Sequence, residues 1–101
     1  MANTSTKVKI KPNLKIAEPR MFKVIYQNDS VTTMEFVVDS LMDHFNHTTD
    51  AAVELTTLIH EKGSAVVAVL PHEVAEQKGI EVTLDAHSQG FPLKVKIEQE
   101  N

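Results

Sequence analysis

Apolar and polar residues alternate near the start of the strongly patterned part of the chain, and the spacing then changes to that of a helix. Apolar side chains recur across residues 22–26, and turn-forming residues follow at 27–29, which predicts a strand that ends in a turn. Thr32 and Glu35 then have the spacing of a capping box, and apolar residues recur at helical intervals as far as Phe45. We therefore expect a strand, a turn and a helix in this order.

A second helix and a second strand are expected between residues 48 and 70. Thr48 or Thr49 provides an N-cap, apolar residues follow at helical spacing, and Gly63 comes directly after a basic last turn, as is usual at a helix C-terminus. Residues 64–70 form a nearly continuous run of small and β-branched apolar side chains. This run predicts a central strand.

The stretch at residues 71–90 contains two competing patterns. Residues 80–85 alternate as in a strand, and Gly79 weakens a helix by about 1 kcal/mol relative to alanine. Pro71 at a first helical position and Gly90 beyond the last turn instead suit the boundaries of a helix. Residues 92–98 then alternate as a half-buried strand, with positions 93, 95 and 97 inward.

Composition and charge restrict the range of functions. The 101 residues suffice for one small domain with shallow binding sites, and the absence of cysteine excludes disulfides and cysteine-based metal sites. The net charge is -4, to which residues 1–20 contribute +4 and the remaining residues -8. The acidic remainder argues against nucleic-acid binding, which requires a basic face. No secretory signal or membrane-spanning apolar run appears, so we expect a cytoplasmic protein that does not act at a membrane.

The division of charge also predicts two regions. We interpret residues 1–20 as a flexible basic N-terminal tail and residues 21–101 as the core domain. Within the tail, lysine alternates with Val8 and Ile10, a pattern that could form a strand if a sheet edge were offered.

Two short segments resemble the motifs of one protein family. Residues 28–38 read N-D-S-V-T-T-M-E-F-V-V, and residues 59–63 read I-H-E-K-G. The first resembles the N-D-D-x-T-P-M-E-F-V run of the ClpS family of Clp protease adaptors, and the second resembles that family's V-H-x-x-G. The similarity continues through residues 73–78 and 92–93, so it covers roughly residues 22–99.

The resemblance implies both a fold and a function. The implied fold is α+β with the order β-α-α-β-α-β: a three-stranded antiparallel sheet with three helices packed on one face, similar to the C-terminal domain of the ribosomal stalk protein. It favours a helix over residues 71–90. The implied function is that of a non-enzymatic, cofactor-free adaptor, expected to be a monomer. Such an adaptor binds proteins with a free N-terminal Phe, Tyr, Trp or Leu and delivers them to a ClpA or ClpC unfoldase.

The resemblance also implies roles for particular residues. Those that would hold the free α-amino group are Asn28, Asp29 and His60. Those that would line the pocket for the first side chain are Thr32, Met34, Val37, Thr56, Ile59 and Leu93. Glu73 and Lys78 match positions that contact the N-terminal domain of the unfoldase.

The chemistry of these side chains agrees with that assignment. An α-ammonium group has three donors and needs acceptors from several directions, which a carboxylate, an amide oxygen and a neutral imidazole provide. Thr56, Ile59 and His60 lie at i, i+3 and i+4, so a helix places them on one face. We expect an acetylated N-terminus to be rejected, because it lacks the charge and two of the donors.

Several alternatives remain open at the level of sequence. Ser30 replaces the family's second aspartate and Thr56 replaces a methionine, which leaves room for a divergent paralogue or an interaction domain with altered or no preference for N-termini. Met34 is compatible with the pocket mouth or with the core. A hydrolase using His60, Asp29 and a hydroxyl of Ser30 or Thr56 is the enzymatic alternative, although no nucleophile motif supports it.

The other histidines indicate no further site. His44 and His47 are three residues apart, which two metal ligands could use, but without a third ligand a solvated helix end is the better interpretation. His72 and His87 belong to no recognisable constellation. We therefore predict no metal site.

Overall fold

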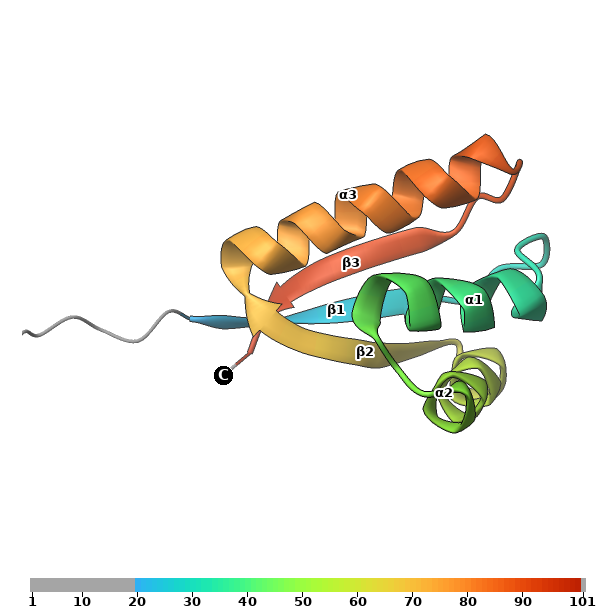
Figure 1. The fold of residues 1–101 in the computed structure, drawn as a ribbon, viewed down its shortest axis with the longest axis horizontal. Helices are drawn as coiled ribbons and strands as arrows, with labels where there is room; N and C mark the ends of the chain where they lie inside the picture. Colours follow the sequence, from blue (N-terminus) through green and yellow to red (C-terminus); the bar gives the residue numbers. More distant parts are fainter. Residues whose placement is uncertain (1–19, 101) are drawn as a thin grey trace, which may run out of the picture.

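A computed structural model describes residues 20–100 of the chain, so the predicted tail lies outside the described residues except for Arg20. The elements are β1 (Met21–Gln27), α1 (Met34–Phe45), α2 (Thr49–Lys62), β2 (Ser64–Pro71), α3 (His72–Ser88) and β3 (Lys94–Gln99) (Figure 1). This order and the α+β class confirm the fold expected from the sequence.

The sheet has the order β2-β1-β3, with β1 in the centre and antiparallel to both neighbours. Tyr26 of β1 pairs with Ala65 of β2 and with Val95 of β3. The register to β2 shifts between Val24 and Ile25, as at a β-bulge. The central position of β1 explains why Val24 and Tyr26 are fully buried.

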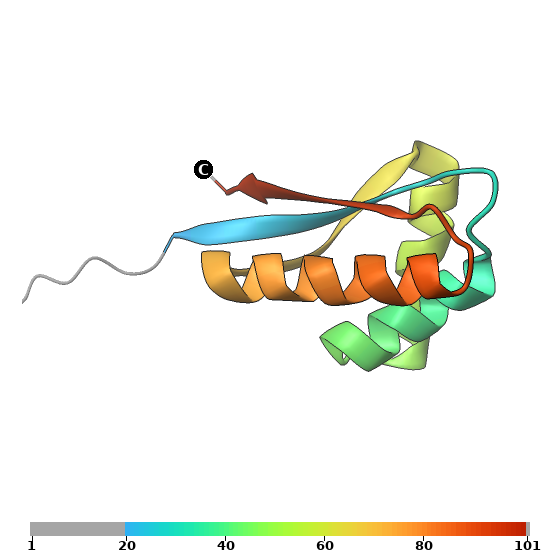
Figure 2. The same cartoon turned by 90° about the horizontal axis from the view of Figure 1, so that it is seen from above.

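The helices close the core against the sheet. α1 and α3 lie along the same face of the sheet (Figure 2), and α2 packs against α1 and β2. Side chains from all six elements and from the turn before β3 meet in one hydrophobic cluster. Among the described residues, no helix is long and apolar enough to cross a membrane.

Helix α3 settles the competition between the two patterns at residues 71–90. Its buried positions Ala75, Gly79, Val82 and Ala86 follow helical spacing, whereas the residues that suggested a strand include Ile80 and Leu84, which are exposed. A narrow stripe of small residues suffices because α3 packs closely on β3: a Cβ atom added at Gly79 would lie 3.4 Å from Cδ1 of Ile97.

The helix ends require three small corrections. The cap of α1 is Thr33, whose hydroxyl accepts a hydrogen bond from the Phe36 amide at 3.1 Å, so the predicted capping box began one residue too early. Pro71 occupies the N-cap of α3 and not its first helical position, because it still pairs with Met21 in the sheet. β3 begins at Lys94 and not at residue 92. For α2, Thr48 is the cap and Gly63 ends the helix with φ 92°, as the pattern predicted.

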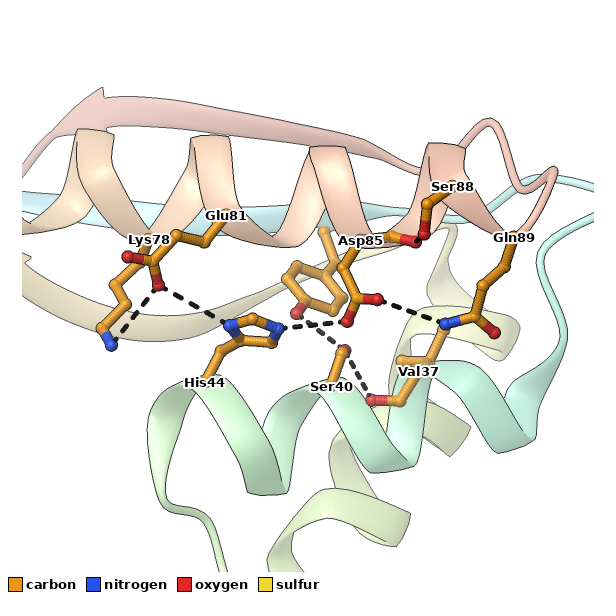
Figure 3. Close-up of polar contacts among 9 residues, drawn as sticks. Val37, Ser40, His44, Lys78, Glu81, Asp85, Ser88 and Gln89 are labelled. Atoms are coloured by element: carbon orange, nitrogen blue, oxygen red, sulfur yellow. Dashed lines mark hydrogen bonds and ion pairs between the residues drawn. The ribbon is translucent and has the colours of Figure 1, made fainter.

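Two histidines that were assigned to a solvated helix end instead connect elements. His47 donates from Nε2 to the Val67 carbonyl at 2.7 Å. His44 lies between α1 and α3, with Nε2 3.2 Å from Asp85 Oδ2 and Nδ1 3.7 Å from Glu81 Oε1 (Figure 3). The interpretation as a solvated helix end was therefore wrong. The sequence pattern did not show these partners because they lie far from His44 and His47 along the chain. Within residues 20–100, no group of three or more histidine, aspartate or glutamate side chains is placed so that it could hold a metal ion.

Candidate functional site

The loop between β1 and α1 is shaped by the carboxylate of Asp29. Oδ1 accepts hydrogen bonds from the amides of Val31 and Thr32 at 2.8 and 2.7 Å, and Oδ2 accepts from the Thr32 hydroxyl at 2.8 Å. Asp29 therefore organises the loop directly, and Thr32 serves as its partner. In this structure both carboxylate oxygens already have protein donors.

These bonds also change the acidity of Asp29. Partial burial by itself raises the pKa of the carboxyl group, but the bonds from the Thr32 amide, the Thr32 hydroxyl and the Val31 amide outweigh burial and leave the pKa below its usual range. Asp29 is therefore ionised at neutral pH. A fixed negative charge at this position favours the protonated form of a neighbouring amine.

One backbone hydrogen bond joins this loop to the end of α2. The amide of Asn28 donates to the Gly63 carbonyl at 2.9 Å, and His60 lies in the last turn of α2 just before that glycine. Asn28 and His60 are both exposed. The two motifs, about thirty residues apart in the sequence, thus come together on the surface.

A hollow of about 250 Å³ lies beside Asn28 and Asp29, and it is also lined by Gln27, Pro92 and Lys94. Leu93, between the last two, is 1 % exposed and belongs to the core. The turn before β3 thus contacts the loop after β1. Gln27, Pro92 and Lys94 were missed as lining residues, although the resemblance at residues 92–93 was a signal for this turn.

The residues predicted to line a side-chain pocket differ in their burial. Val37, Thr56, Ile59 and Leu93 are at most 6 % exposed, so their side chains pack in the core. Thr32 is half-buried. Met34 is 47 % exposed, which excludes the interpretation of this residue as a core methionine.

The hydroxyl of Thr56 is already paired within α2. It donates to the Ala52 carbonyl at 2.7 Å, one helical turn earlier. This bond satisfies the donor of a buried hydroxyl. The hydroxyl donor of Thr56 is therefore not available to a ligand in this structure.

A buried pair of hydroxyl groups connects α1 to the central strand β1. The Tyr26 hydroxyl lies 2.8 Å from the Ser40 hydroxyl, and Ser40 donates to the Val37 carbonyl at 2.9 Å. Tyr26 and Ser40 link β1 to the turn of α1 that carries Val37. The sequence indicated neither role, and the only signal was a serine on the apolar face of a predicted helix.

Glu73 and Lys78 lie on α3, away from the loop of Asn28 and Asp29. Both line one open hollow of about 540 Å³, so the structure brings this predicted pair to one surface. Lys78 is 3.8 Å from Glu81, the same carboxylate that faces His44. Figure 3 shows the run from Lys78 through Glu81 to His44.

Residues 17–96 match the family model described as ATP-dependent Clp protease adaptor protein ClpS. The chain belongs to the ClpS family. The ATP-dependent Clp protease adapter protein ClpS of Wolinella succinogenes is 42 % identical over 90 residues, which cover 89 % of this chain and 88 % of that protein. The ClpS of Clostridium acetobutylicum is 41 % identical over 94 residues, 93 % of each chain.

A solved ClpS structure shares the fold. ClpS2 of Agrobacterium tumefaciens, bound to L-phenylalaninamide, superposes with a TM-score of 0.79 and is 36 % identical, covering 82 % of this chain and all of that one. ClpS proteins are adaptors of the Clp protease and not enzymes. The hydrolase considered from the sequence is therefore wrong.

Proposed function

We propose that this ClpS-family adaptor binds proteins whose free N-terminal residue is bulky and hydrophobic, namely Phe, Tyr, Trp or Leu, and delivers them to an unfoldase of the ClpA or ClpC type. The observation that carries the proposal is the junction of the loop carrying Asn28 and Asp29 with the end of α2 carrying His60. The relative bound to L-phenylalaninamide supports it, because that ligand has a free α-amino group and a phenyl side chain.

Asn28, Asp29 and His60 would contribute to binding of the α-amino group in different ways. The amide oxygen of Asn28 and the neutral imidazole of His60 accept hydrogen bonds from the α-ammonium group. Asp29 fixes the loop through Thr32 and adds negative charge nearby. Its carboxylate contributes to affinity even where its oxygens are occupied, because charge acts over several ångströms.

The hydrophobic side chain would enter between α1 and α2. Met34, exposed at the start of α1, forms the movable rim, and Val37, Thr56, Ile59 and Leu93 form the wall behind it. Burial of one Leu or Phe side chain contributes roughly 1.5 to 3 kcal/mol. A divergent pocket with altered or no preference is the second candidate, and Ser30 and Thr56 are the departures that favour it.

Delivery would use the other side of the molecule. Glu73 and Lys78 on α3 bind the N-terminal domain of the unfoldase, and residues 1–20 assist the transfer. The adaptor acts as a cytoplasmic monomer. Reversal of both charges, by Glu73→Lys with Lys78→Glu, should weaken binding to the unfoldase domain and leave peptide affinity unchanged. Loss of both affinities would indicate misfolding of the variant.

Fluorescence anisotropy with a peptide labelled at its C-terminal end tests substrate binding. We expect the peptide with a free N-terminal Phe to bind and its acetylated form not to bind. His60→Ala should weaken binding by about 5- to 150-fold, the equivalent of one polar group left unpaired at about 1 to 3 kcal/mol. His87→Ala is the matched control, because His87 is also an exposed histidine in the last turn of a helix.

The same assay separates the two candidates. Binding of the free peptide that is lost in the His60 variant supports the proposal, whereas no binding across a panel of free Phe, Tyr, Trp and Leu peptides contradicts it and favours the divergent alternative. Thr56→Met tests the pocket wall. We expect it to change the ranking among the four peptides, and an unchanged ranking would refute a role of Thr56 in selectivity.

A further inference from the structure

Three adjoining open hollows, of about 580, 540 and 410 Å³, follow α3 from its N-terminal end. The third is also lined by Gly79, Val95 and Ile97, so it lies in the groove between α3 and β3. The first and second share Glu73 and Val74, and the second and third share Glu76 and Ile80. We call this surface the α3 trough. It extends from the N-terminal end of α3 to Leu84.

The α3 trough combines exposed apolar side chains with an acidic rim. Val74, Ile80 and Leu84 are 43, 54 and 66 % exposed. Ile80 and Leu84 are four residues apart in α3, so their side chains lie next to each other on one face of the helix. Glu73, Glu76 and Glu81 line the same hollows. The cation that lines them within α3, Lys78, lies 3.8 Å from Glu81. The surface is therefore suited to a segment that is both basic and apolar.

The charge of the helices points in the same direction. α1, α2 and α3 together contain ten acidic residues and two lysines. Residues 1–20 carry a net charge of +4. In that segment Lys7, Lys9 and Lys11 alternate with Val8 and Ile10, and Leu14 and Ile16 follow. The chain thus contains a segment of the composition that the trough requires.

The first described residue lies beside the trough. The described residues begin at Arg20, and Arg20 itself lines the first hollow. Ten extended residues reach about 33 Å, and the 17 residues of α3 span about 26 Å. A segment tethered at one end of its site has an effective concentration in the millimolar range. The acidic hollow on α2, lined by Glu54, Leu58 and Glu61, has no such tether.

We propose that residues 7–16 of this chain bind in the α3 trough. Residue 16 lies near the N-terminal end of α3 and residue 7 near Leu84. The apolar side chains of the segment cover Ile80 and Leu84. In this direction Lys15 faces Glu73, and Lys7, Lys9 and Lys11 lie along Glu76 and Glu81. The bound segment covers Glu73 and Lys78, so a partner that uses these residues must displace it. This consequence rests on the proposed function, whereas the docking itself does not.

Paramagnetic relaxation enhancement on the full chain tests the docking. The chain has no cysteine, so Ser5→Cys provides one position for a nitroxide label. We expect amide signals of residues 80–88 to lose most of their intensity and those of residues 54–61 on α2 to keep theirs. A label at Asn13→Cys should move the effect toward residues 73–77. Equal broadening of α2 and α3, or none on α3, would overturn the proposal.

Variants separate the apolar and the charged contributions. The pair Ile80→Ser with Leu84→Ser should abolish the broadening, whereas the matched pair Val53→Ser with Leu58→Ser, exposed positions on α2, should leave it unchanged. Replacement of Lys7, Lys9 and Lys11 by glutamate should also abolish it, and persistence after that change would refute the charge argument. Labelled chain mixed with unlabelled ¹⁵N chain reports on contacts between copies. Broadening of the unlabelled copies would assign the trough to a second molecule and overturn docking within one chain.

Discussion

Replacement of Tyr26 by phenylalanine tests how the central strand is tied to α1. The Tyr26 side chain is fully buried and its hydroxyl lies 2.8 Å from that of Ser40. Tyr26→Phe removes one hydrogen bond and leaves Ser40 bonded to the Val37 carbonyl. No buried group then lacks a partner, so we expect a loss of about 1 kcal/mol in the free energy of unfolding.

Replacement of the partner residue should cost more, although it also removes a single hydroxyl group. Ser40→Ala leaves the Tyr26 hydroxyl buried without its partner, which costs about 1 to 3 kcal/mol. The double variant removes both hydroxyls and leaves neither unpaired. Its destabilisation should be smaller than the sum of the two single values by about 1 kcal/mol.

Urea unfolding of the four proteins measures this cycle. A loss of 1 kcal/mol corresponds to about 4 to 8 °C in Tm for a domain of this size. If Ser40→Ala costs no more than Tyr26→Phe, or if the two values simply add, the hydroxyl pair does not act as we infer.

A pH titration checks the burial of Tyr26 independently. Burial raises the pKa of the phenol most, the bond with Ser40 lowers it, and the charge of Asp85 raises it further, so the pKa lies well above its usual range. The folded state therefore holds the phenol proton more tightly than the unfolded state does. Protonation of Tyr26 contributes fully to the stability of the fold below about pH 10, and this contribution is lost as the pH rises above that value. Tyr26 is the only tyrosine and tryptophan is absent, so tyrosinate absorbance reports on this residue alone. Tyrosinate formed near pH 10 without loss of the circular dichroism signal would refute the buried position.

Three further predictions concern local structure. Gly79→Ala should stabilise α3 by up to about 1 kcal/mol, because the added Cβ would meet side-chain atoms of Ile97 and Val95 at 3.4 and 3.7 Å, which are ordinary contact distances. Gly79→Leu should destabilise the fold. Thermal unfolding of both variants tests this, and a destabilising alanine would show that the approach of β3 tolerates no methyl group. Thr33→Ala should cost about 1 kcal/mol through loss of the α1 cap, measured by urea unfolding, and an unchanged midpoint would contradict the capping bond. The hydrogen bonds to Asp29 should protect the Val31 and Thr32 amides from hydrogen exchange at neutral pH. This protection should be lost only when the pH falls below about 4, because the folded-state pKa of Asp29 is lowered. Loss of protection already near neutral pH would contradict this loop geometry.

Local sequence patterns were sufficient for most of the elements. The alternation at residues 22–26, the cap at Thr48 and the stop at Gly63 each depend on neighbours a few residues away, and each appears in the structure. The error at Thr32 was small but informative. Both Thr32 and Thr33 are capable of capping, and Asp29, bonded to Thr32, leaves Thr33 to cap α1.

Local patterns could not define α3. The alternation at residues 80–85 shows where the apolar side chains are in the sequence, but it does not show which of them are buried. Ile80 and Leu84 are exposed, while Gly79 and Ala86 are buried. The burial of Gly79 depends on the close approach of β3, and that approach is a long-range contact.

The same distinction applies to the candidate site. The motifs made Asn28, Asp29 and His60 candidates because family resemblance preserves residue types and spacing. Only the tertiary structure showed that Asp29 uses both carboxylate oxygens within its loop and that His44 faces two carboxylates of α3. The sequence by itself therefore determined most of the elements and the residue types of the candidate site, because these depend on short-range geometry and side-chain chemistry. Burial, hydrogen-bond partners and the exposed α3 trough were decided by contacts between segments far apart in the chain.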